Sequence, residues 1–125
     1  MKDNQINVLV ADDEEIIRTL ITDLLTDQGF KVIVAKNGKE AVDLSKESFF
    51  HIAFVDVHMP IMNGVETLKM IKEISPKTTI VMMDSYPDMF VDEALSEGAT
   101  TCIHKPFDIK EIIGIVNRII ENNKI

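Results

Sequence analysis

Short apolar runs alternate with amphipathic segments five times along this chain. The apolar runs are rich in β-branched residues and have the length of strands, at 6–11, 31–35, 51–56, 78–83 and 101–104. Because strands that alternate with helices form a parallel sheet covered on both faces, the pattern predicts an α/β fold with one five-stranded parallel sheet and five helices. Right-handed crossovers favour the flavodoxin-like strand order 2-1-3-4-5.

The segments between these runs repeat apolar residues at helical spacing, which predicts helices at 14–27, 39–47, 64–74, 88–97 and from 109 onward. Gly29 suits the left-handed conformation that closes a helix. Asp108 and Glu111 form an acidic variant of the capping box, and Asn37-Gly38 indicates a turn. The predicted apolar stripes are Ile16, Ile17, Leu20, Ile21, Leu24 and Leu25 in the first helix and Ile109, Ile112, Ile113, Val116, Ile119 and Ile120 in the last.

Composition narrows the class of protein. A length of 125 residues fits one domain, 1–125, and a net charge of −8 argues against nucleic acid as a direct partner. Cys102 is the only cysteine and cannot form an internal disulfide, so we expect a reducing compartment. The chain does not open with a signal-peptide pattern, and no run approaches the roughly 20 apolar residues that span a bilayer. We therefore expect a soluble, cytoplasmic domain without a membrane partner.

Polar residues lie at or directly after the carboxyl ends of four of the predicted strands. In a parallel sheet, ligands bind at the carboxyl ends of the strands, so these residues are expected to meet at one edge. Crowded carboxylates repel one another unless a cation neutralises them, and hard oxygen ligands suit Mg²⁺. Helix capping by Asp would explain one of these acids but not the whole set. The set comprises Asp12, Asp13, Asp56, Asp84, Ser85 and Lys105.

Asp56 is the candidate nucleophile of this edge. A carboxylate can attack a phosphoryl group and form an acyl phosphate. Mg²⁺ would bridge Asp56 and the incoming phosphoryl oxygens, while Lys105 would neutralise the developing charge.

The remaining potential metal ligands are predicted to have ordinary structural roles. His51, His58 and His104 are scattered singly along the chain, without metal-ligand spacing. Cys102 is more often a small core residue than a reactive thiol.

These residues resemble the receiver domain of two-component response regulators, the CheY-like family, over essentially the whole chain. Four motifs in combination carry the resemblance: ADDEE at 11–15, FVDVHMPIMNG at 54–64, GA at 98–99 and HKPF at 104–107. Met59-Pro60 and Gly64 match the loop that shapes the family's site.

The resemblance implies a role for each matching position. Asp12 and Asp13 fall on the acidic pair that binds the metal, and Asp56 falls on the phosphoacceptor. The metal site would also use the backbone carbonyl of His58. Lys105 falls on the family's lysine, and the peptide bond that follows it is expected to be cis.

Two positions depart from the family's pattern. Asp84, with Ser85 next to it, stands where the family has Thr or Ser, and Cys102 stands where the family has an aromatic switch residue. Three outcomes are open for Asp84. It could turn away while Ser85 supplies the hydroxyl, it could be protonated and donate a hydrogen bond, or it could pair with Lys105 and imitate the phosphorylated state.

The resemblance implies a switch rather than a turnover enzyme. Asp56 would take a phosphoryl group from a phosphohistidine of a sensor histidine kinase or phosphotransfer protein, in a Mg²⁺-dependent reaction, and thereby change which partner binds. The partner would be a downstream protein or an attached output domain. Met89, Phe90 and Ile115 could serve a homodimer contact on the face of the fourth helix, fifth strand and fifth helix, or simply the core. The alternative is a phosphorylation-independent interaction module whose pocket Asp84 freezes.

Overall fold

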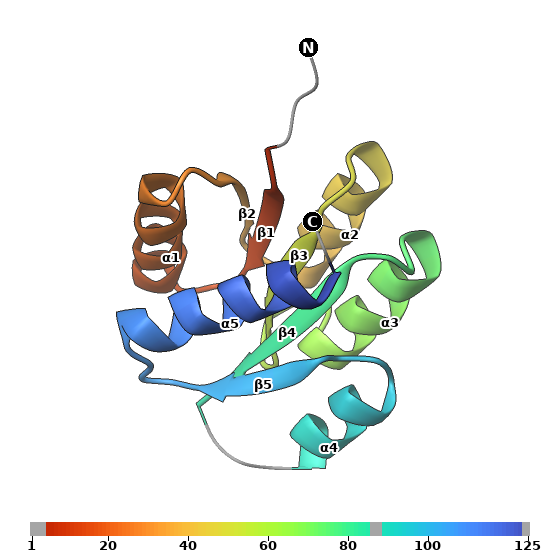
Figure 1. Ribbon diagram of the computed structural model, residues 1–125. Helices are drawn as coiled ribbons and strands as arrows, with labels where there is room; N and C mark the ends of the chain where they lie inside the picture. Colours follow the sequence, from red (N-terminus) through yellow and green to blue (C-terminus); the bar gives the residue numbers. More distant parts are fainter. Residues whose placement is uncertain (1–4, 86–88, 124–125) are drawn as a thin grey trace.

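The fold is one parallel sheet between two layers of helices (Figure 1). The computed structural model describes residues 5–85 and 89–123, and for Met89 and Phe90 it describes the backbone alone. The strand order is β2-β1-β3-β4-β5, which confirms the predicted topology. The strands are β1 (Asn7–Ala11), β2 (Lys31–Ala35), β3 (Ile52–Asp56), β4 (Thr79–Asp84) and β5 (Thr101–His104).

Helices α1 and α5 cover one face of the sheet, and α2, α3 and α4 cover the other (Figure 1). Each lies within one or two residues of its predicted bounds, except that the predicted first residue of the fourth helix, Asp88, lies outside the described residues. The helices are α1 (Glu15–Asp27), α2 (Gly38–Glu47), α3 (Gly64–Ile74), α4 (Met89–Ser96) and α5 (Ile109–Asn123).

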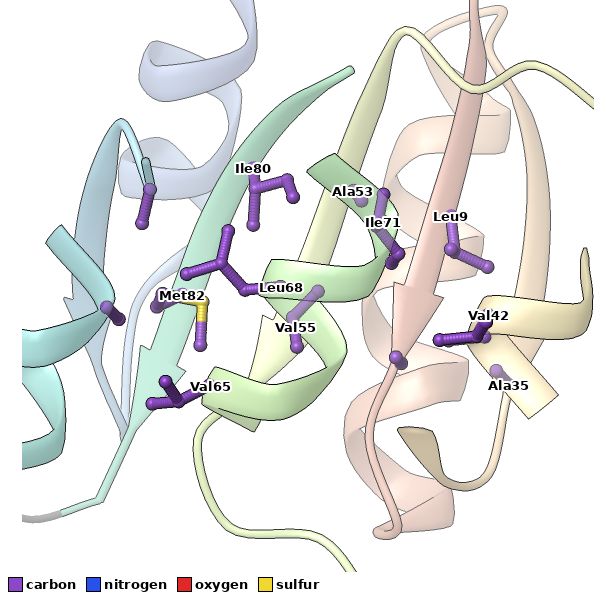
Figure 2. Packing of buried hydrophobic residues seen from close by; sticks show 14 of the residues in the cluster. Leu9, Ala35, Val42, Ala53, Val55, Val65, Leu68, Ile71, Ile80 and Met82 are labelled. Atoms are coloured by element: carbon purple, nitrogen blue, oxygen red, sulfur yellow. The ribbon is translucent and has the colours of Figure 1, made fainter. Parts of the chain in front are cut away.

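The side chains of the central strands alternate between the two faces of the sheet and contribute to the core on both faces. Successive side chains of a strand point to opposite faces. Val55 and Met82 therefore pack under α3, where they meet Leu68 (Figure 2), while Phe54 and Met83 face α1 and α5. All five residues of β3 are buried, as expected of a central parallel strand. This packing fixes the carboxyl ends of β1, β3 and β4 side by side.

Two residues of the predicted apolar stripes lie outside the core. Ile16 in α1 is 80% exposed and Ile109 at the start of α5 is 53% exposed. Successive helical residues are about 100° apart, so Ile16 points away from the sheet when Ile21 and Leu25 face it. The predicted stripes were therefore too wide. Ile115, on α5, is half-buried and packs against the core cluster between the sheet and the layer of α1 and α5. This agrees with the core role that the sequence left open for it.

Local polar contacts set the helix starts. The side chain of Asn37 accepts a hydrogen bond of 2.8 Å from the backbone of Glu40, so the predicted turn is in fact the N-cap of α2. Asp108 accepts from the backbone of Glu111 at 2.8 Å, which confirms the capping half of the predicted box. Gly29, with φ +94°, closes α1 as predicted.

Gly64 lets the start of α3 pack directly on the end of β3. A Cβ atom there would overlap the carbonyl oxygen of Asp56 and lie 2.7 Å from Cα of Val57. We expect Gly64→Ala to lower the free energy of unfolding by about 1–3 kcal/mol, because backbone must move to admit the methyl group. Gly114→Ala is the matched control, since Gly114 lies inside α5 with open space around it. That variant should gain about 0.5–1 kcal/mol. Urea denaturation measures both, and equal effects would contradict the expected clash.

Candidate functional site

Three carboxylates meet at the carboxyl edge of the sheet. One oxygen from each of Asp12, Asp13 and Asp56 lies within 4.8 Å of the others. Asp12 directly follows β1 and Asp56 ends β3, and the parallel pairing of these two strands brings together residues far apart in sequence. Asp12 is fully buried and Asp56 is 5% exposed, whereas Asp13 is open to solvent.

Helix capping does not account for the acidic pair. Glu14 occupies the N-cap position of α1, and its side chain makes no capping hydrogen bond. The Oδ1 atom of Asp12 instead accepts a hydrogen bond of 2.9 Å from the backbone N–H of Glu14, which fixes the carboxylate at the edge of the sheet. Arg18 donates to the backbone carbonyl of Asp12 at 2.8 Å and holds the turn before α1.

The ammonium group of Lys105 joins this cluster from the end of β5. Its Nζ lies 2.7 Å from Oδ2 of Asp12, 2.9 Å from Oε1 of Glu14 and 3.5 Å from Oδ2 of Asp56, and the side chain is 8% exposed. The Lys105-Pro106 peptide bond is cis, as the resemblance implied. The ion pair with Glu14 was not predicted. The sequence could have suggested this ion pair, because Glu14 directly follows Asp12 and Asp13 and so lies at the same edge of the sheet.

The electrostatics of the pocket favour a cation. Burial, the largest cause, and the nearby charge of Asp12 together raise the pKa of Asp56 to about 7, against the opposing effect of Lys105. Burial also raises the pKa of Asp12. Burial alone would lower the pKa of Lys105, but its hydrogen bonds to Asp12 and Glu14 outweigh that effect and raise it. The pocket therefore holds carboxylates whose ionisation is opposed by their surroundings.

The donor set fits Mg²⁺. It consists of carboxylate oxygens, two of them on fully or nearly buried side chains and one on the solvent-exposed Asp13. Mg²⁺ takes hard oxygen ligands and keeps several waters, so a pocket with an exposed side suits it. The backbone N–H of His58 donates to Oδ1 of Asp56 at 3.4 Å, which places this loop against the same carboxylate. The use of the His58 carbonyl as a metal ligand remains a prediction.

Asp84 belongs to a different part of the sheet edge. It is fully buried at the end of β4, next to Met83, which pairs in register with Asp56 and faces α1 and α5. Alternation turns Asp84 to the opposite face. Its Oδ2 lies 3.6 Å from Nδ1 of His104, while Lys105 is paired with the acids described above. Of the three outcomes left open for Asp84, pairing with Lys105 is not supported, because the ammonium pairs with Asp12, Glu14 and Asp56. The neighbouring Ser85 is exposed.

The loop between β3 and α3 completes the site. Asn63 forms a capping box with Glu66, and the N–H of Gly64 donates to the carbonyl of Val57 at 2.8 Å. Ile61, in the middle of this loop, has φ +72° and is 77% exposed, a backbone conformation that β-branched residues rarely adopt. The loop that matches the family's motif is thus anchored at the end that touches Asp56.

Comparison with known proteins identifies relatives along most of the chain. A family model described as "Response regulator receiver domain" matches residues 8–117. The chemotaxis protein CheY of Thermotoga maritima is 34% identical over 114 residues, which cover 90% of this chain and 95% of that protein. The transcriptional regulatory protein ZraR of Klebsiella oxytoca is 34% identical over 113 residues, but the match covers only 26% of its length. This chain therefore spans about a quarter of some relatives and nearly all of others.

A solved structure shares the fold closely. In the CheX–CheY–BeF₃–Mg²⁺ complex from Borrelia burgdorferi, a chain 30% identical to this one superposes with a TM-score of 0.85. The alignment covers 91% of this chain and 88% of that one.

Across residues 5–85 and 89–123 of this chain, none of the helices has both the length and the apolar character needed to cross a bilayer.

Proposed function

This chain belongs to the family of response regulator receiver domains of two-component systems, and from that premise we propose that Asp56 is the phosphoacceptor of a Mg²⁺-dependent switch. One observation carries the proposal. The carboxylate of Asp56 lies beside two further carboxylates and 3.5 Å from the ammonium of Lys105. Such a cluster can hold a cation and an anion next to one nucleophile.

The chain's own residues supply the groups that phosphoryl transfer needs. An oxygen of Asp56 attacks phosphorus, the new O–P bond forms as the P–N bond of a phosphohistidine breaks, and the imidazole nitrogen leaves with the electron pair and takes up a proton. Lys105 places its positive charge next to the attacking carboxylate of Asp56. Asp12, Asp13, Asp56 and the carbonyl of His58 would hold Mg²⁺, which when bound supplies positive charge to the phosphoryl oxygens.

The biological setting is part of the same proposal. The donor would be a sensor histidine kinase or a phosphotransfer protein, and the phosphorylated form would change its affinity for a downstream protein or an attached output domain. Residues 1–125 would form one receiver domain in the cytoplasm, and a homodimer would use the face of α4, β5 and α5. The domain would act as a switch that catalyses its own phosphorylation and dephosphorylation.

Small phosphodonors test the proposal directly. Incubation with Mg²⁺ and acetyl phosphate or phosphoramidate, followed by intact mass spectrometry, is expected to add one phosphoryl group. Asp56→Ala should add none, because the nucleophile is gone. If wild-type protein binds Mg²⁺ but gains no mass, the phosphorylation-independent interaction module replaces the switch as the better account.

Asp84→Thr tests whether the unusual acid takes part in the Mg²⁺ pocket. The Asp84 carboxylate faces His104 on the other side of the sheet from Met83. We therefore expect this variant to keep the Mg²⁺ affinity of the wild type in a fluorescence or calorimetric titration. Asp13→Asn is the matched control and should weaken Mg²⁺ binding, because it removes one of the three clustered carboxylates. Equal losses in both variants would place Asp84 in the pocket.

A further inference from the structure

A second group of potential metal ligands lies apart from the Asp12, Asp13 and Asp56 cluster. Asp84, Cys102 and His104 each offer one ligand atom, and these three atoms lie within 4.8 Å of one another. The group combines a carboxylate, a thiol and an imidazole. It therefore differs in chemistry from the all-carboxylate pocket.

The sheet itself produces this arrangement. Strands β4 and β5 run side by side and parallel (Figure 1), with Asp84 opposite His104 and Met82 opposite Cys102. Residues two apart on a strand share a face, so Cys102 and His104 point the same way. Cys102 packs against the cluster that contains Met82, which places all three ligands on the α3 and α4 side of the sheet. Rigid backbone pairing thus positions ligands from two strands.

The spacing of the ligand atoms suits a small ion. Oδ2 of Asp84 and Nδ1 of His104 are 3.6 Å apart, which is longer than a direct hydrogen bond. Two ligands on one tetrahedral Zn²⁺, each bonded at about 2.0–2.1 Å, lie about 3.3–3.4 Å apart. The ligand atom of Cys102 lies within 4.8 Å of the other two, so it would have to move closer to them to bind the same ion.

Exposure provides an entry path. Asp84 is fully buried, Cys102 is half-buried and the side chain of His104 is 63% exposed. An ion could bind His104 first from solvent and then reach the two deeper ligands.

We propose that Asp84, Cys102 and His104 form a second metal site, selective for Zn²⁺ or a chemically similar divalent transition metal ion. Thiolate and imidazole ligands favour such ions over Mg²⁺, which prefers oxygen. The three side chains would supply three positions of a tetrahedral centre, and a water molecule or an outside ligand would take the fourth. Binding releases the thiol proton of Cys102 to solvent.

Cobalt spectroscopy and zinc competition test this site on the full chain. The metal-free protein, kept reduced with a phosphine, is titrated with Co²⁺ and, separately, with Zn²⁺ against a chromophoric chelator. We expect a thiolate-to-cobalt charge-transfer band in the near ultraviolet and visible bands typical of tetrahedral cobalt. Removal of even an outer-shell partner lowers metal affinity by roughly 10–100-fold. Cys102→Ser and His104→Gln are therefore each expected to weaken Zn²⁺ binding by at least about 100-fold.

The controls separate the two metal sites. Asp13→Asn should keep the Zn²⁺ affinity and the cobalt spectrum of the wild type while it weakens Mg²⁺ binding. Circular dichroism and retained Mg²⁺ affinity show that Cys102→Ser and His104→Gln are folded. The proposal is overturned if wild-type protein gives no thiolate band with Co²⁺. It is equally overturned if Zn²⁺ binds these two variants as tightly as the wild type, or if Asp13→Asn removes Zn²⁺ binding.

Discussion

Asp56→Asn is expected to make the metal-free protein more stable at pH 8. Burial and the charge of Asp12 raise the pKa of Asp56 from 3.8 to about 7, so at pH 8 the folded protein holds a carboxylate charge that its surroundings disfavour. Asparagine keeps the shape of the side chain without the charge. Because one pKa unit corresponds to about 1.4 kcal/mol, the gain in the free energy of unfolding should reach a few kcal/mol.

The pH dependence of this gain has a definite sign. Below about pH 3.8, Asp56 is protonated in both the folded and the unfolded chain and costs nothing. Between about pH 3.8 and 7 the folded state binds the proton more tightly, so stability falls as the pH rises. Above about pH 7 the full cost is present. The advantage of Asp56→Asn should therefore be largest at pH 8 and shrink steadily as the pH is lowered toward 4.

Urea denaturation in the presence of a chelator measures the difference at several pH values. Asp23→Asn is the matched control, because Asp23 is exposed on α1 and its charge is hydrated in both states. Added Mg²⁺ should stabilise the wild type more than Asp56→Asn, since the cation binds the folded carboxylate cluster. A variant less stable than the wild type at pH 8, in the absence of metal, would show that the pocket does not oppose ionisation of Asp56.

The sequence was sufficient to predict that Asp12, Asp13 and Asp56 meet at the sheet edge, although it placed Asp84 with them. Asp12 follows one apolar strand and Asp56 ends another, and the parallel pairing of those two strands brings the two acids together. Lys105 could be placed in the same way from the end of the fifth strand. These predictions depend on strand order and strand ends, which hydrophobic patterning determines well.

The direction in which the Asp84 side chain points could not be predicted, because it depends on whether the fourth strand ends at residue 83 or at residue 84. The predicted strand ended at residue 83, which left Asp84 in a loop with no fixed direction. The structure extends β4 through Asp84, so its side chain follows the alternation of the strand and turns to His104. The grouping with Cys102 depends further on the register of β4 against β5. The register between two strands cannot be read from the spacing of residues along the chain. The sequence alone therefore favours ordinary structural roles for His104 and Cys102.

Lys105→Met is expected to slow phosphorylation of Asp56 by roughly 100-fold, the effect typical of removing one group that stabilises charge in a transition state. Its ammonium is 3.5 Å from the Asp56 carboxylate and is nearly buried, so water cannot fully replace it. Mg²⁺ affinity should be kept or increased, because a competing positive charge has been removed from beside Asp12.

Time courses of labelling by phosphoramidate, read by intact mass, measure this rate, and Lys110→Met is the control because Lys110 is exposed on α5. Loss of Mg²⁺ binding in Lys105→Met would indicate a collapsed pocket, in which the ion pairs with Asp12 and Glu14 serve structure alone. A rate equal to that of the wild type would mean that Lys105 stays with Glu14 during transfer. A slow rate with intact Mg²⁺ binding would instead require the ammonium to exchange its carboxylate partners for the phosphoryl oxygens, which the short distance to Asp56 allows.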